Sequence, residues 1–73
     1  MDSLKQEFVK EFDEKVMTMK YLVLAIRLPN GAIELITNTM DFQEKFQYIM
    51  SAYDKDMKIY NNISIQIVNW MIV

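Results

Sequence analysis

Carboxylates are the most numerous side chains in this sequence that could take part in chemistry. The chain has ten Asp and Glu against eight Lys and Arg, and it has no His and no Cys. His is the commonest general base, and Cys supplies the thiol nucleophile. Ser3, Ser51 and Ser64 therefore have no His partner, and no sequence pattern places a pair of carboxylates in a pocket. We expect no enzymatic activity, no metal site and no cofactor.

Two groups of carboxylates have spacings that could serve binding. Glu7, Glu11 and Glu14 share a face of a predicted helix, where they could imitate the phosphates of a nucleic acid. Lys residues are interleaved with them, and Glu11 is spaced to pair with Lys15, so a solvated helix face is the simpler interpretation. Residues 54–56 begin like a calcium loop, but the Gly and the distal Glu of that loop are missing. We interpret them as a turn.

The stretch Lys20–Thr37 predicts two strands joined by a tight turn, and the rest of the chain is organised around it. Tyr21–Leu28 is apolar on both faces, which is typical of a strand in the middle of a sheet. Pro29–Gly31 contains the only Pro and the only Gly of the chain. This composition favours a type I turn followed by a Gly bulge. Ala32–Thr37 then forms the second strand.

One amphipathic helix is predicted on each side of this hairpin. The first covers Asp2–Thr18, with a capping box over Ser3–Gln6 and apolar residues that recur every four positions. The second covers Thr39–Tyr53; either Thr39 or Asp41 can cap it, and Asp41–Glu44 resembles a second capping box. Its apolar residues also lie on one stripe, as packing against a sheet requires.

The element order predicts the architecture. The last strand covers Ile63–Val73, so the order is α-β-β-α-β, and Met57–Tyr60 before it is a short strand or a loop. We expect an α+β fold in which a three-stranded antiparallel sheet, with strand order 2-1-3, is packed by two helices. Residues 1–73 should form a single domain. The helix over residues 1–18 is interpreted as an element added to a β-β-α-β body.

Apolar surface should remain exposed on this fold. Hydrophobic residues make up 52% of a 73-residue chain, and a domain this small cannot bury them all. The helices should pack on one face of the sheet, and the opposite face should carry Tyr21, Val23, Ala25 and Trp70. The uncharged segment Val68–Val73 should be an edge strand that pairs with a partner through Val68 and Ile72, with Trp70 and Tyr21 as anchors. The alternative is that Trp70 fills the core between sheet and helix.

Several stretches resemble the small accessory proteins of bacteriophages that infect low-GC Gram-positive bacteria. They are Lys20–Glu34, Phe42–Lys45, Tyr53–Asp56 and Ile65–Val68. The resemblance implies a protein that binds and inhibits a host enzyme or a defence system, because a short gene encodes an interface more easily than an active site. It carries over no functional residues.

These observations together predict a small, non-enzymatic protein-binding module, a phage-type modulator or inhibitor of a host protein or defence system. One alternative is a structural homo-oligomer, and another is a nucleic-acid mimic that uses Glu7, Glu11 and Glu14. The net charge of −2 argues against nucleic acid as a partner. The sequence has no apolar run long enough to span a bilayer, so we expect no membrane partner and a cytoplasmic location, in the host if the gene is a phage gene.

Overall fold

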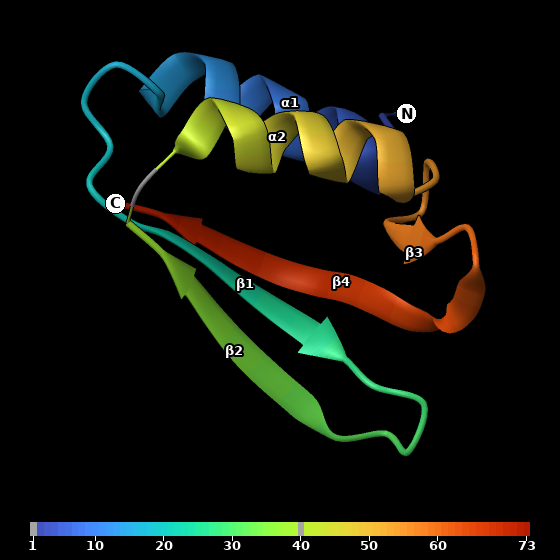
Figure 1. Cartoon of the computed structure of the whole chain (residues 1–73). Coiled ribbons are helices and arrows are strands. Elements are labelled where there is room, and N and C mark those ends of the chain that lie inside the picture. The colour runs from blue at the N-terminus through green and yellow to red at the C-terminus, as the bar shows by residue number, and fades with distance from the viewer. Residues whose placement is uncertain (1, 40) are drawn as a thin grey trace.

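Two helices and four strands make up the computed structural model, which describes residues 2–39 and 41–73 (Figure 1). The sheet is antiparallel throughout, so the predicted α+β class with two helices and an antiparallel sheet is confirmed. The elements in chain order are α1 (Leu4–Lys15), β1 (Leu22–Arg27), β2 (Ile33–Asn38), α2 (Phe42–Ala52), β3 (Lys58–Ile59) and β4 (Asn62–Ile72).

Helix α1 begins with the predicted capping box. The Gln6 N–H donates to the Ser3 hydroxyl at 3.2 Å, and the Ser3 N–H donates to the Gln6 side-chain carbonyl at 2.9 Å. Two N–H groups that the first turn leaves without helical partners are satisfied in this way. Lys15 pairs with Glu11 at 3.0 Å, as their spacing predicts. The helix ends at Lys15 and so stops short of the predicted boundary.

Helix α2 begins at Phe42, and the capping box predicted over Asp41–Glu44 is wrong. Asp41 has a left-handed backbone (φ 57°, ψ 51°), and its side chain makes no capping hydrogen bond within the described residues. An N-cap side chain reaches the helix from an extended backbone, which Asp41 does not have. The predicted start of this helix spans residue 40, which lies outside the described residues.

The β1–β2 hairpin forms as predicted. The Gly31 N–H donates to the Leu28 carbonyl, and the Leu28 N–H donates to the Ala32 carbonyl, both at 2.8 Å. Gly31 has φ +87°, a conformation that side-chain-bearing residues rarely adopt. This geometry agrees with the expected Gly bulge after the turn. From Arg27 opposite Ile33 to Leu22 opposite Asn38, the two strands then pair without a register shift.

The sheet has four strands in the order β2-β1-β4-β3, so the predicted three-stranded order 2-1-3 is wrong in detail. β1 lies between β2 and β4, in agreement with its apolar sequence. β4 is 11 residues long and β1 only six, so the first part of β4 extends beyond β1. There it pairs with the short strand β3. The last strand is therefore not a bare edge along its first half.

A bulge in β4 changes which of its side chains face the helices. Ala25 pairs with Asn69, whereas the next residue of β1, Ile26, pairs with Ile67, so Val68 falls between the paired positions. One extra residue reverses the alternation of side chains along a strand. Ile67 and Trp70 consequently both lie on the same face as the buried side chains of β1, although their numbers differ by three.

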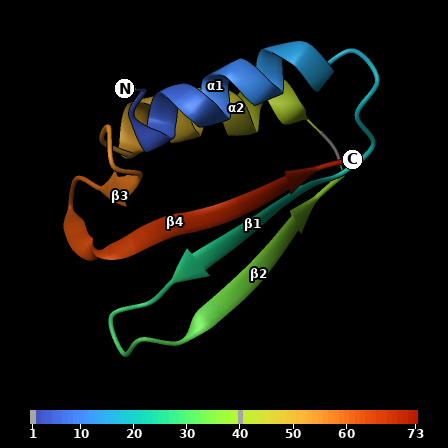
Figure 2. The ribbon, with the colours of Figure 1, turned by 180° about the vertical axis from the view of Figure 1, so that it is seen from behind.

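Both helices lie on the same face of the sheet and run in opposite directions (Figures 1 and 2). The Phe12 and Phe46 rings stack across the two helices, with centroids 4.4 Å apart. No described helix or strand covers the other face. The buried hydrophobic core consists of Phe8, Phe12, Met19, Leu22, Leu24, Ile26, Ile49, Tyr53, Met57, Ile67 and Ile72.

The central strand should dominate stability. Leu24 is 1% exposed, so we expect Leu24→Ala to cost about 2–5 kcal/mol of unfolding free energy, the usual range for a buried large-to-small change. Ile63→Ala is the matched control, because Ile63 lies in the same sheet but is 68% exposed. Thermal and urea melts of both variants measure the difference. A Leu24→Ala melt within a few degrees of wild type would contradict a central role for β1.

Removing α1 should leave the sheet unprotected. Phe8 and Phe12 are buried against the core, and Phe8 also meets Trp70 of β4 edge to face. We expect a chain without residues 1–18 to be partly folded and prone to aggregation, because the apolar surface under these rings becomes exposed. Circular dichroism and light scattering test this expectation. A soluble, monomeric truncated chain with a cooperative melt would show that α1 is dispensable.

Candidate functional site

The face of the sheet opposite the helices is apolar and exposed. Side chains alternate between the two faces of a strand, so the residues of β1, β2 and β4 that do not point to the helices meet on this side. Three of the largest are well exposed: Leu35 by 69%, Met71 by 57% and Ile33 by 54%. We call this surface the open face, and it comprises Tyr21, Val23, Ala25, Ile33, Leu35, Met71 and Val73.

The open face is hollowed at its centre. Val23 pairs with Met71 on one side, and Ala25 pairs with Leu35 on the other. The small β1 side chains form a floor between longer side chains, and a depression of about 120 Å³ results. Asn69 also lines it, and Trp70 borders it although its ring points toward the helices. A partner side chain could enter this depression, as interface anchors do.

The border of the open face is polar. Thr37 pairs with Val23 on the β2 side, and Asn69 pairs with Ala25 on the β4 side. At the end nearest the β1–β2 turn, the Arg27 guanidinium donates a hydrogen bond to the Gln66 side-chain carbonyl. An apolar centre with a polar border is the usual anatomy of a protein–protein interface.

Trp70 does not lie on the open face, so its predicted position is wrong. It pairs with Leu24 and points toward the helices. Its ring meets Phe8 edge to face, with centroids 5.3 Å apart and planes at 85°. The indole N–H donates to the Glu11 carboxylate. The structure thus bears out the alternative interpretation, in which Trp70 fills the space between sheet and helix.

The other predicted partner-binding residues are divided between several surfaces. Tyr21 is on the open face and is 47% exposed. Ile72 points to the helices and is buried, and Val68 is half-buried at the bulge. The open-face residues that sequence reasoning missed are Ile33, Leu35, Met71 and Val73. Their signal was the alternation in Ala32–Thr37 and the uncharged end of the chain, but assigning them required the strand register.

The three predicted carboxylates come together beside Trp70. Glu7, Glu11 and Glu14 line a shallow hollow of about 480 Å³ on α1, which Trp70 borders. Lys10 lines the same hollow and offsets part of its negative charge. Hydrogen bonds, first from Lys15 and then from Trp70, hold the pKa of the Glu11 carboxyl below its usual value. The hollow is therefore acidic, but one of its carboxylates already has two partners.

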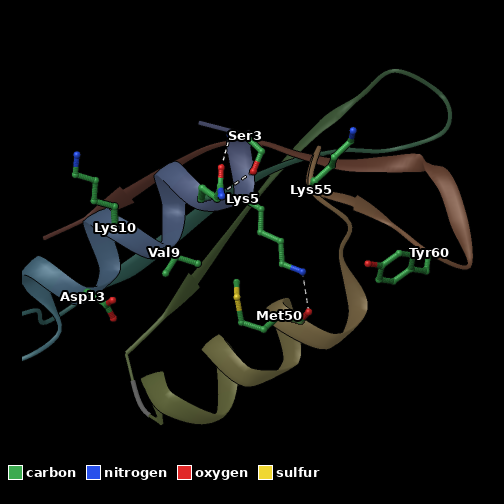
Figure 3. Close-up of a pocket in the computed structure, with 9 residues that line it drawn as sticks. Ser3, Lys5, Val9, Lys10, Asp13, Met50, Lys55 and Tyr60 are labelled. Atoms are coloured by element: carbon green, nitrogen blue, oxygen red, sulfur yellow. Dashed lines mark hydrogen bonds between the residues drawn. The ribbon is translucent and has the colours of Figure 1, made fainter. Parts of the chain in front are cut away.

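A larger groove of about 740 Å³ runs along α1 to the end of α2 (Figure 3). The Lys5 ammonium lies in this groove but already has protein partners. It donates to the Met50 carbonyl at 2.8 Å and to the Tyr53 carbonyl at 2.7 Å. Met50 is in the last turn of α2 and Tyr53 is the residue just after it, so neither carbonyl has a further helical N–H group to accept from. Lys5 consequently acts as a cap of α2, and we interpret the groove as structural.

The Asp-Lys-Asp sequence at residues 54–56 forms a turn, as predicted. The Asp54 carboxylate accepts hydrogen bonds from the Asp56 N–H at 2.9 Å and from the Lys58 N–H at 3.0 Å. The Lys58 N–H, more than any other group, lowers the pKa of Asp54. Within residues 2–39 and 41–73, no three Asp or Glu side chains lie close enough together to hold a metal ion.

Comparison of this chain with known proteins finds no relative. The chain matches no protein-family model, and neither the curated proteins nor the solved structures contain a match. In the part of the chain that the structure describes, both helices are too short and too polar to cross a membrane.

The Trp70–Glu11 hydrogen bond gives a test of this geometry by pH titration. Trp70→Phe keeps an aromatic ring but removes the N–H donor, so we expect the pKa of Glu11 to rise toward its usual value. Lys15→Gln should raise the pKa of Glu11 more than Trp70→Phe does, because the hydrogen bond from Lys15 is the larger cause of the lowered pKa. Carboxyl NMR titration measures both changes. Identical Glu11 titration in Trp70→Phe and wild type would contradict the hydrogen bond.

The sign of the accompanying stability change follows from the lowered pKa. The contacts of Glu11 stabilise the fold above the unfolded-state pKa of this carboxyl, and that contribution is lost as the pH falls through the lower, folded-state pKa. The free energy of unfolding of Trp70→Phe should therefore fall less steeply than that of wild type as the pH is lowered through the titration range of Glu11.

Proposed function

We propose that this protein is a small, non-enzymatic binding module that docks onto another protein through the open face. The observation that carries the proposal is the contiguous apolar surface on three strands, with large side chains that are about half exposed. Soluble monomers rarely expose such a patch without a binding role. Met and Tyr, which are both present here, are residue types enriched in interfaces.

The partner we propose is a bacterial host protein that the module modulates or inhibits. The resemblance to phage accessory proteins supports this choice of partner. The interface would have an apolar centre around Val23 and Ala25 and a polar border at Thr37, Asn69 and Arg27. A partner of suitable chemistry presents an apolar ridge or a large side chain that fills the central depression and hydrogen-bond donors or acceptors at the border.

Met71→Lys should abolish docking while leaving the fold intact. Met71 is exposed and lines the depression of the open face, so an ammonium that a partner buries there would be left without a partner. Ile63→Lys is the matched control, because Ile63 is also exposed on β4 but does not belong to the open face. Capture from a lysate of a low-GC Gram-positive bacterium, with mass spectrometry, identifies proteins that bind wild type and Ile63→Lys but not Met71→Lys.

Calorimetry with the purified partner then gives the size of the effect. We expect Met71→Lys to weaken binding at least about tenfold, the loss usual for an interface hot spot. Wild-type binding should have a negative heat-capacity change, the mark of apolar burial. Equal binding by Met71→Lys and Ile63→Lys would refute docking through the open face.

A nucleic-acid mimic is the second candidate function, because the structure gathers Glu7, Glu11 and Glu14 around one hollow. The dependence of partner binding on salt concentration distinguishes docking through the open face from nucleic-acid mimicry. Docking through an apolar face should change little with ionic strength, whereas binding through a row of carboxylates should weaken steeply. Glu7→Gln with Glu14→Gln should abolish binding only if the acidic hollow is the interface.

A further inference from the structure

Strand β2 presents a free backbone edge. Of the described strands, only β1 pairs with it. The Leu28 N–H donates to the Ala32 carbonyl, and hydrogen-bonded pairs alternate along an antiparallel ladder. The N–H and C=O groups of the even-numbered residues in β2 therefore face β1. Those of Ile33, Leu35 and Thr37 face outward, where Figure 2 shows no other element.

This edge has few of the features that usually keep edge strands from pairing with other chains. Such strands carry Lys, Pro or a bulge, or they are very short. β2 is six residues long and contains neither Lys nor Pro, and its register with β1 has no shift. The exception is Glu34, a charged side chain that pairs with Ile26 on the helix side of the sheet and is exposed to solvent there.

The outer edge of β4 is protected by comparison. β3 pairs with its first half, and the Ile67 N–H donates to the Met57 carbonyl at 2.8 Å. Further along, the Trp70 N–H donates to the side-chain carbonyl of its neighbour Asn69 at 2.9 Å. The β2 edge is thus the less protected of the two.

We propose that β2 pairs antiparallel with β2 of a second copy, about a two-fold axis at Leu35, so that two sheets become one. Leu35 then lies opposite Leu35 of the second copy, and Ile33 lies opposite Thr37. Each of these pairs can exchange two hydrogen bonds, because their N–H and C=O groups are the ones that face outward. All three side chains are on the open face, so apolar groups meet across the new contact.

Charge and the length of β2 together select this register over its neighbours. With Leu35 at the axis, Glu34 lies opposite Ile36 of the second copy, so no like charges meet. Moving the axis to Glu34 would place two carboxylates directly opposite each other, which is destabilising. Moving it to Ile36 would place Ile33 opposite Thr39, which lies outside β2. The Leu35 register therefore makes the most pairs without a charge conflict.

Pairing through the edge leaves the open face free. The two open faces would lie side by side on the same side of one continuous sheet. A docking partner could then contact both open faces at once, and so a larger apolar surface than one copy offers. This consequence for partner docking rests on the proposed function, whereas the dimer itself does not.

Single cysteines test the register directly, because the chain has no Cys of its own. In the proposed dimer the two Leu35 Cα atoms are ~5.5 Å apart, within the range of a disulfide. Ile33→Cys is the matched control: it lies on the same strand and face, but its two copies are ~14 Å apart along the strands. Under mild oxidation, Leu35→Cys should form a covalent dimer and Ile33→Cys should not. Equal cross-linking of both variants, or of neither, overturns the proposal.

Sedimentation tests the edge without a cross-link. Wild type should be a dimer at micromolar concentration, and Thr37→Pro should be a monomer because it removes an outward N–H. Thr37→Val keeps that N–H and should remain a dimer. Met71→Lys should also remain a dimer while it no longer binds the host partner. The experiment therefore tells a wrong dimer proposal apart from a wrong docking proposal. Monomeric wild type, or dimeric Thr37→Pro with wild-type affinity, overturns the proposal.

Discussion

Stacking between the aromatic side chains of the two helices determines the rest of this structure. The Phe12 and Phe46 rings lie 4.4 Å apart, and Phe8 stacks on Phe46 at 6.2 Å. This contact holds α1 and α2 side by side on one face of the sheet, and the Lys5 ammonium ties the end of α2 to α1. Each helix has one apolar stripe, which is used on that face. Residues 2–39 and 41–73 form no third helix that could cover the other face, so the open face remains exposed.

The bulge at Val68 determines what the open face contains. It reverses the alternation of β4, so Trp70 turns toward Phe8 and Glu11, and Met71 turns outward. On the opposite side of the face, β2 presents its side chains to the open face and its outward backbone groups to the edge. A host protein on the face and a second copy at the edge would use different atoms of the same strand. The two proposed interactions are therefore compatible.

The parts of the fold that depend on neighbouring residues could be predicted from the sequence. The capping box over Ser3–Gln6 and the turn over Pro29–Gly31 depend on a few adjacent side chains, and both formed. The apolar sequence of Tyr21–Leu28 indicated a central strand, because a strand buried on both faces needs apolar residues at every position. By contrast, the cap expected at Asp41 failed because its backbone is left-handed, a conformation that its side chain does not dictate.

For the site, the sequence alone determined that the chain has more apolar residues than its helices and sheet can bury, and it placed Tyr21, Val23 and Ala25 on the exposed side. It assigned Trp70 to that side wrongly and missed Met71. Which of the two faces outward depends on how β4 pairs with β1, more than 40 positions away in the chain. Only the tertiary structure decided that, because an extra residue in β4 reverses every side chain beyond it.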